Sequence, residues 1–282
     1  LFPETIDSIR NEFDGLLPQE NIRVWSAPRS VNSLDSDNTW RRQSAELVRE
    51  AFLASLKPDI VLVTSLFEGL GDDAVTSIGM LSSNILTATI LYDLIPFINR
   101  QPFLENPVVE AWYENKLDHL RRSDLLLAIS ESSRQEGVHY LGLTDEMTVN
   151  ISTAADHQFQ PQSINSRQES IIRERYKLHR PYVMYTGGID HRKNIEGLIR
   201  AYASLPKALR RQHQLAIVCS IQPHDKVRLE ELAKTCKLKK DELVLTGFIP
   251  ENDLLALYGL CKLFVFPSWH EGFGLPALEA MS

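Results

Sequence analysis

The sequence has few cysteines, no long apolar run and no excess of positive charge. Its three cysteines, Cys219, Cys236 and Cys261, form no CxxC pair, and each lies in an apolar pattern. We therefore expect reduced core thiols rather than disulfides or a metal site. No apolar run approaches the roughly 18 residues that would span a bilayer. The 30 basic and 37 acidic residues give a net charge of −7, which excludes a protein whose whole surface binds nucleic acid but leaves room for a local basic pocket.

The length of 282 residues is about twice that of a usual domain, so we expect two compact units. A hydrophobic content of 43% and a charged content of 24% are typical of a water-soluble globular protein. The sequence begins with Leu1 and ends at Ser282, inside a helical pattern that has barely begun at Pro276. These two ends predict a fragment of a longer chain.

Apolar runs of strand length alternate with stripes of helical period. One stripe places Val109, Trp112, Tyr113 and Lys116 on the same face of a predicted helix after Pro107. The alternation predicts βαβ units and largely parallel sheets whose strands are buried on both faces. The predicted strands are Ile60–Val63, Ile85–Tyr92, Leu125–Ile129, Tyr182–Tyr185, Leu215–Cys219, Leu243–Leu245 and Leu263–Phe266.

The alternation breaks between Asn150 and Arg180, where the sequence becomes polar and irregular. We place the domain boundary there, between residues 155 and 156, which gives units 1–155 and 156–282. Each unit is predicted to be a doubly wound, Rossmann-like α/β domain. Because such sheets bind ligands beyond the carboxyl ends of their strands, we expect the two domains to face a cleft that holds the site.

The stretch from Phe264 to Glu279 is the richest in chemistry. An apolar strand leads into a loop with Gly272 and Gly274, and Pro276 suits the first turn of the helix that follows. The free N–H groups of a helix start bind anions, while the carboxylates of Glu271 and Glu279 accept hydrogen bonds from hydroxyls. This pattern predicts a ligand with both phosphate and sugar. The alternative for Glu279 is an acidic residue of the first turn that complements the helix dipole.

A second strand, turn and helix pattern begins at Tyr182. It ends its strand at Gly187 and Gly188 and opens a helix with Arg192 and Lys193. The spacing is not that of a P-loop. Glycines allow the backbone to approach a ligand closely, and the two cations suit a diphosphate. The alternative is a solvated basic turn.

Four motifs together resemble the retaining glycosyltransferases of family 4, which have the GT-B fold. They are EGFGLPALEAM with its Glu271-x7-Glu279 spacing, TGGIDHRKN, TGFIP at Thr246–Pro250 and AISESS at Ala128–Ser133. The resemblance runs from about Asp59 to the end and is strongest after Tyr182. Within the family, the chain is most similar to bacterial mannosyltransferase-like enzymes that build lipopolysaccharide O-antigen or other surface polysaccharides.

The resemblance implies a role for each matching residue. Lys193 would contact the donor diphosphate, Phe248 and Ile249 would line the base pocket, and Glu279 would accept the ribose hydroxyls. Glu271 and the backbone after it would hold the sugar and its phosphates. The implied catalytic residues are Glu271, Lys193 and Asp93. The implied donor-binding residues are Gly187, Gly188, Arg192, Lys193, Phe248, Ile249, Glu271, Gly272, Phe273, Gly274, Leu275 and Glu279.

The sequence departs from the family pattern at two places. Gly188 stands where many members carry an arginine, so Arg192 is the candidate to supply that charge. Tyr92 stands where many members have a histidine before the aspartate, here Asp93. Family members also have a first strand and a glycine-rich loop ahead of the position of Leu1, so part of the acceptor side is expected to be missing.

The resemblance implies transfer of a hexose, such as mannose, from a nucleoside diphosphate sugar to a glycan or lipid-linked acceptor with retention of configuration. It implies no cofactor, no metal and no nucleic acid partner, with a cytoplasmic location and peripheral association with the inner face of the membrane. Two alternatives remain: a non-catalytic nucleotide-sugar binding protein of the same fold, and a Rossmann dehydrogenase.

Two weaker motifs and one serine test other interpretations. Asp35-Ser36-Asp37 matches the DxD of metal-dependent glycosyltransferases but follows a polar segment instead of a strand. Gly69-x-Gly71-x-x-Ala74 imitates a dinucleotide fingerprint but does not directly follow the strand that ends at Val63. Ser130 is predicted to cap a helix and not to act as a nucleophile.

Overall fold

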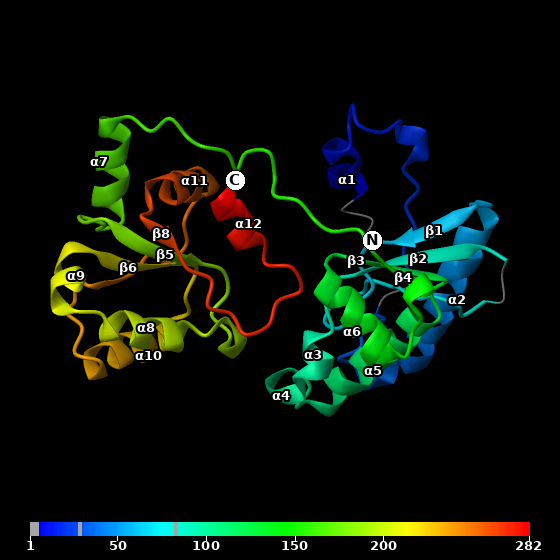
Figure 1. Cartoon of the computed structure of the whole chain (residues 1–282). Helices are drawn as coiled ribbons and strands as arrows, with labels where there is room; N and C mark the ends of the chain where they lie inside the picture. The colour runs from blue at the N-terminus through cyan, green and yellow to red at the C-terminus, as the bar shows by residue number, and fades with distance from the viewer. Residues whose placement is uncertain (1–5, 28–29, 82–83) are drawn as a thin grey trace. The chain divides into compact units, whose positions relative to one another are not determined.

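The structure is a computed structural model that describes residues 6–27, 30–81 and 84–282. The chain divides into two compact units, Leu1–Thr153 and Ala154–Ser282, so the division lies two residues before the position expected from the sequence. The start at Leu1, on which the expectation of a fragment rests in part, lies outside the described residues. Each unit is described by itself below (Figure 1).

The first unit contains a parallel sheet of four strands in the order β1-β2-β3-β4. Consecutive strands are neighbours, so each connection crosses over one face of the sheet. The sequence prediction included the first three strands and missed the fourth. The strands are β1 (Ile60–Val63), β2 (Leu86–Leu91), β3 (Leu125–Ala128) and β4 (Thr148–Asn150).

Helices of the first unit precede and connect these strands. The core lies between the sheet and α5, where Leu117 and Leu120 of the helix pack with Leu91 and Leu126 of the strands. The α-helices are α1 (Ile6–Glu12), α2 (Thr39–Ser55), α3 (Ile95–Ile98), α4 (Arg100–Phe103), α5 (Pro107–Arg121) and α6 (Glu131–Leu141). The 3-10 turns are η2 (Gln19–Asn21), η3 (Ser36–Asn38) and η4 (Asp145–Met147).

Ser130 begins α6 in the way the sequence predicts. Its backbone is extended, and its side chain accepts a hydrogen bond from the backbone N–H of Ser133 at 3.0 Å. The bond satisfies one of the N–H groups that a helix start leaves without an intrahelical partner. The prediction of a helix cap is therefore confirmed.

The second unit contains a parallel sheet in the order β7-β6-β5-β8. All four strands were predicted from the sequence. They are β5 (Tyr182–Thr186), β6 (Gln214–Val218), β7 (Leu243–Leu245) and β8 (Leu263–Phe264). The helices are α7 (Ser166–Arg175), η5 (His191–Lys193), α8 (Ile195–Ser204), α9 (Lys207–Gln212), α10 (Pro223–Thr235), α11 (Glu251–Leu260) and α12 (Leu275–Met281).

Two hydrophobic cores cover opposite faces of this second sheet. One contains Ile199 and Leu229 from α8 and α10, and the other contains Ile172 and Leu257 from α7 and α11. Every residue of β6 is buried, as expected for a strand of a parallel sheet with helices on both faces. Burial on both faces of the sheet explains why the strands appear as continuous apolar runs in the sequence. The three cysteines are free and partly buried.

Candidate functional site

Two loops of the second unit meet at the carboxyl edge of its sheet. Strands β5 and β8 are parallel neighbours, so the loops that follow them, 187–194 and 265–274, leave the same edge. The backbone N–H of Trp269 donates to the carbonyl of Arg192 at 2.9 Å, and Asn194 Nδ2 donates to the carbonyl of Pro267 at 3.2 Å. These bonds join the two loops into one structure, which we call the paired loops.

Lys193, Arg192 and Glu271 form an ion-pair cluster where the paired loops meet. Lys193 Nζ lies 2.6 Å from Glu271 Oε1, and Arg192 donates to Glu271 Oε2 at 2.9 Å. Arg192 also pairs with Asp190 at 3.0 Å. Only 10% of the Lys193 side chain is exposed. The alternative interpretation of a solvated basic turn is therefore wrong, because the lysine is packed against a carboxylate of the other loop.

The cluster keeps its carboxylate ionised. Burial raises the pKa of Glu271, but the hydrogen bonds that its carboxylate accepts, first of all from Lys193, together with the positive charge of Lys193 outweigh burial and hold this pKa below its ordinary value. At neutral pH the cluster is therefore one carboxylate held by two cations. An anionic ligand that reaches Lys193 and Arg192 must compete with Glu271 for them.

Glycine is required at two places in the paired loops. Gly187 has φ +136°, and a Cβ there would lie 3.0 Å from the hydroxyl of Tyr185, which itself donates to the carbonyl of Gly188 at 2.6 Å. Gly274 has φ +99°, and its Cβ would lie 3.2 Å from the ring of Phe266. Side chains rarely adopt such backbone angles, so both turns depend on glycine.

Glu279 lies deeper in its helix than the sequence suggested. Helix α12 begins at Leu275, with Pro276 in its first turn, so Glu279 belongs to the second turn and cannot act as a first-turn residue that complements the dipole. Its Oε2 accepts a hydrogen bond from the hydroxyl of Tyr258 in α11 at 2.7 Å. This bond uses one carboxylate oxygen and fixes the side chain. The role of Glu279 toward a ribose stays a prediction.

The other predicted donor residues are distributed around the same edge. Gly272 is buried, Phe273 is partly buried and Leu275 is 39% exposed. Phe248 follows β7 and is 78% exposed, whereas Ile249 packs against the core beside α7 and α11. The structure thus gives these two neighbours different environments, and their shared base pocket stays a prediction.

Asp93 belongs to the first unit and stabilises a turn. It directly follows Tyr92 at the end of β2, and its Oδ1 accepts from the backbone N–H of Ile95 at 2.9 Å where α3 begins. Tyr92 is 51% exposed, and its carbonyl accepts a bond from the hydroxyl of Ser133 at 2.7 Å. The structure does not position the first unit relative to the paired loops, so the catalytic role of Asp93 stays a prediction.

The two weaker motifs lack the structural context of their functions. Asp37 lies in the short turn η3, and its N–H donates to Asp35 Oδ1 at 3.1 Å. Within the described ranges, no three His, Cys, Asp or Glu residues are grouped to hold a metal ion. Gly69 has φ +82°, and the segment after it forms a loop instead of the helix that a dinucleotide fingerprint opens. The dehydrogenase interpretation has no support here.

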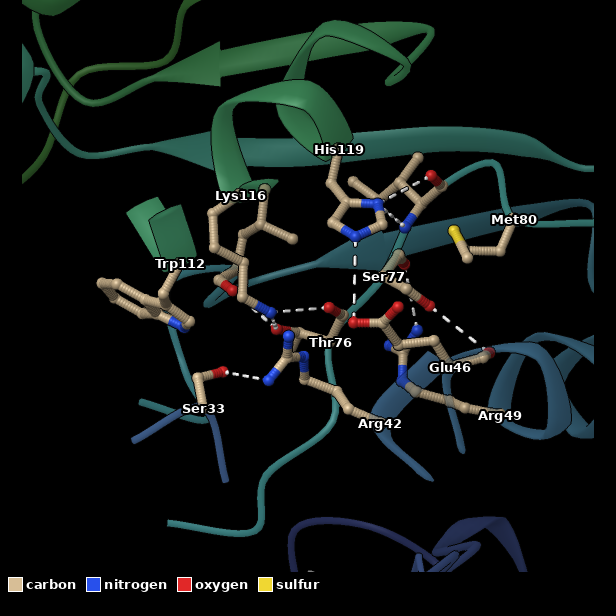
Figure 2. A network of polar contacts seen from close by, with 12 residues as sticks. Ser33, Arg42, Glu46, Arg49, Thr76, Ser77, Met80, Trp112, Lys116 and His119 are labelled. Atoms are coloured by element: carbon tan, nitrogen blue, oxygen red, sulfur yellow. Dashed lines mark hydrogen bonds and ion pairs between the residues drawn. The ribbon is translucent and has the colours of Figure 1, made fainter. Parts of the chain in front are cut away.

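Sequence reasoning missed a buried polar network in the first unit (Figure 2). Lys116 is 3% exposed, and its Nζ donates to the carbonyl and the hydroxyl of Thr76 at 2.8 and 2.6 Å. His119 Nε2 lies 3.9 Å from the buried carboxylate of Glu46. Burial raises the pKa of Glu46 and lowers the pKa of Lys116 to about 8. The available signal was Lys116 itself, a lysine on the apolar stripe of a predicted helix.

Comparison with known proteins gives this geometry a family context. Residues 166–282 match the family model of glycosyl transferases group 1. Two Escherichia coli proteins are similar in sequence. Serotype-specific mannosyltransferase WbdA is 36% identical over 99% of this chain and 34% of its own length, and O-antigen chain mannosyltransferase B is 31% identical over 58% and 42%. The chain spans about one third of the length of the WbdA proteins.

Solved structures of other proteins share this architecture. HepE from Anabaena in complex with UDP has a TM-score of 0.62 at 18% identity, over 96% of this chain and 68% of that one. Sucrose-phosphate synthase from Thermosynechococcus elongatus has a TM-score of 0.61 at 20% identity, over 87% and 58%. These likenesses show the fold, which is the α/β GT-B class with two Rossmann-like units. The predicted fold class is confirmed.

Within the described part of the chain, no helix combines the length and the apolar character needed to cross a membrane.

Proposed function

We propose that the protein that carries this chain is a retaining glycosyltransferase of family 4. It moves a hexose, for which mannose is the first candidate, from a nucleoside diphosphate sugar to a glycan or lipid-linked acceptor. The reaction belongs to lipopolysaccharide or other surface polysaccharide synthesis. The names of the two Escherichia coli relatives support mannose and O-antigen. The observation that carries the proposal is the cluster of Lys193, Arg192 and Glu271 at the junction of the paired loops.

The cluster suits the charge that develops when a glycosyl–phosphate bond breaks. Negative charge grows on the leaving diphosphate, and two cations already fixed in place stabilise it without reorganising at that moment. A diphosphate that takes over Lys193 and Arg192 releases the carboxylate of Glu271. The released carboxylate then accepts hydrogen bonds from hydroxyls of the donor sugar.

We propose front-side attack, assisted by the departing phosphate, as the route to retention. The acceptor hydroxyl forms the new bond at the anomeric carbon on the face that the diphosphate leaves, and its proton passes to the leaving phosphate oxygen. No metal enters this scheme, because the cations of the paired loops supply the positive charge. We also propose a cytoplasmic location with peripheral association at the inner face of the membrane, where a lipid-linked acceptor is available.

A transfer assay with the full-length protein tests the proposal. GDP-mannose and other nucleoside diphosphate sugars are each offered with glycan and lipid-linked acceptors, and NMR of the product gives the configuration at the anomeric carbon. Transfer with the configuration of the donor supports the proposal. An inverted product, or transfer that survives the double substitution Arg192→Ala and Lys193→Ala, contradicts it.

A non-catalytic nucleotide-sugar binding protein is the second candidate, because Tyr92 stands where family members have a histidine. Tyr92 is 51% exposed at the carboxyl end of β2, so this tyrosine does not replace a buried core residue. Tight binding of a nucleoside diphosphate sugar, with neither transfer nor hydrolysis across the acceptor panel, would favour this candidate.

A further inference from the structure

The amino edge of the second sheet carries a concentration of exposed cations. The four strands are parallel, so their amino ends lie at one edge, opposite the paired loops. Within six residues before each strand start there is at least one exposed lysine or arginine. We call this surface the basic edge, and it consists of Lys177, Arg211, Lys237, Lys239, Lys240 and Lys262.

The acidic residues of the same segments are already neutralised. Asp241 pairs with Arg180 at 3.1 Å, and Glu242 pairs with the buried Arg210 at 3.1 Å. Among the described residues, none of the six cations of the basic edge has an ion-pair partner within 4.0 Å. The chain has a net charge of −7, but the basic edge is a local surface of positive charge. Acidic residues of the same segments do not cancel this positive charge.

A rigid scaffold holds the four segments together beneath these side chains. Arg180 donates to the carbonyl of Arg211 at 2.9 Å and to that of Asp241 at 2.5 Å. Gln214 donates to the carbonyls of Lys177 and Asp241, both at 3.0 Å. The N–H of Lys262 donates to the carbonyl of Tyr182 at 2.8 Å. The cations thus extend from one fixed base and not from separate mobile loops.

Exposed leucines lie among the cations. Helix α9 lies beside the amino end of β6 (Figure 1). Leu205, just before this helix, is 39% exposed, and Leu209, within the helix, is 45% exposed. Leu263, the first residue of β8, is 56% exposed. Lysines with interspersed leucines suit a surface of anionic lipid headgroups, where the charges meet phosphates and the apolar side chains enter the interface.

The residue types favour lipid over nucleic acid. Five of the six cations are lysines, which act as point charges toward a diffuse anionic surface, whereas arginine is preferred for bidentate contacts to phosphate. Proteins that bind single-stranded nucleic acid also present aromatic side chains on which bases stack, whereas the large exposed apolar residues among these cations are Leu205, Leu209 and Leu263.

We propose that the basic edge docks the protein on a membrane surface rich in anionic lipids. The surface lies at the edge of the sheet opposite the paired loops, so docking leaves the candidate donor site uncovered within its unit. This inference gives a location to the membrane association that forms part of the proposed function. It rests on the charges and contacts of the basic edge and not on the transfer reaction.

Flotation with lipid vesicles tests the proposal. The chain is mixed with vesicles of phosphatidylglycerol and phosphatidylethanolamine, or of phosphatidylcholine alone, at low and at raised salt. The test variant is Lys237→Glu, Lys239→Glu, Lys240→Glu, and the matched control, Arg23→Glu, Arg167→Glu, Lys226→Glu, changes the net charge equally with exposed cations outside the basic edge. Circular dichroism and nucleoside diphosphate binding are measured for both variants.

We expect binding to the anionic vesicles only, weakened by salt, because exposed charges are screened within about 10 Å at 0.1 M salt. Each lysine near an anionic surface contributes about 1 kcal/mol, so the test variant should lose at least about 100-fold in partitioning. The control should lose far less, and nucleoside diphosphate binding should not change.

Three results would overturn the proposal: no binding to anionic vesicles, an equal loss in the control variant, or binding to single-stranded RNA without binding to vesicles. Because vesicle binding is measured without donor or acceptor, failure here leaves the proposed transferase function standing. Failure of the transfer assay likewise leaves the basic edge intact.

Discussion

Lys193 is the residue on which we expect donor binding to depend most. It is 8% exposed and faces Glu271, so its charge lies in a partly desolvated site where hydrogen bonds to anions are strong. We predict that Lys193→Ala weakens nucleoside diphosphate binding by about 1.5–3 kcal/mol, the range for a charge-assisted bond. In this variant Glu271 still has its ion pair with Arg192, so we expect the fold to be preserved. Calorimetric titration measures the effect, with the exposed Lys226→Ala as control, and unchanged affinity in a folded variant would remove Lys193 from the site.

For Glu271 we predict the opposite effect, a substitution that tightens nucleoside diphosphate binding. Glu271 occupies both cations in the absence of ligand, so Glu271→Gln should free them and tighten binding of a nucleoside diphosphate by about 1 kcal/mol. The gain should be smaller for the sugar nucleotide, because the carboxylate also accepts sugar hydroxyls in the proposed complex. Titration of both ligands tests this, with Glu231→Gln as a control of equal charge change. Weaker binding of the plain diphosphate would show that Glu271 does not compete for the cations.

The identities of the candidate site residues come from the sequence, but their contacts could not be predicted from it. Glycines after two strands indicated the paired loops, and the cations after Gly188 indicated an anion. Nothing in the sequence indicated that Glu271 would be held by Lys193, because that pairing depends on β5 and β8 being neighbours. The depth of Glu279 in α12 also depends on where the helix begins, and helix ends are weakly specified by sequence.

At the scale of elements, helix α5 holds the loop between β1 and β2. Lys116 of α5 bonds to Thr76, and the Trp112 indole donates to the carbonyl of Glu68 at 3.2 Å. Both contacts come from side chains on the buried stripe of the helix. The loop at the carboxyl end of β1 is therefore anchored by a buried lysine.

This anchor predicts a dependence of stability on pH. Burial lowers the pKa of Lys116 from 10.5 to about 8, so between these values the unfolded state binds more protons than the folded state. Stability of the first unit should therefore rise with pH across this window. Lys116→Met removes the titrating group. The difference in melting temperature between wild type and variant should shift in favour of wild type as pH rises from about 8 to about 10.5, and a constant difference would contradict the assignment.

The strands were easier to predict than the turns. Buried parallel strands read as continuous apolar runs, and seven of them were found with ends that differ by at most two residues from those observed. The missed strand β4 has three residues, Thr148–Asn150, and Val149 is 44% exposed. A strand that is short and half exposed has no apolar run to reveal it.

At the scale of the whole molecule, the two units could be predicted from the alternation of strands and helices in the sequence, whereas the distribution of charge over the surface could not. The net charge of −7 gave no sign of the basic edge. Its six cations are separated by up to 85 positions (177 to 262) and become neighbours only because four parallel strands begin at one edge. Composition reports the sum of charges, and topology decides where they gather.

We expect the full-length protein to catalyse transfer without a metal ion. The cations of the paired loops face the proposed diphosphate, and the Asp35-Ser36-Asp37 segment lies in a turn without a preceding strand. We predict that transfer by the full-length protein persists in excess EDTA. Loss of transfer in EDTA, with rescue by Mn²⁺, would restore the DxD interpretation.

Hydrogen–deuterium exchange of the 282-residue chain, with and without a nucleoside diphosphate, tests the central claim most directly. The ligand should slow exchange of the backbone amides in residues 187–194 and 267–275, since these segments form the paired loops and the start of α12. The protection should be lost in the double variant Arg192→Ala and Lys193→Ala. Protection confined to residues 64–74 of the first unit, or protection of the paired loops that persists in the double variant, would contradict the account.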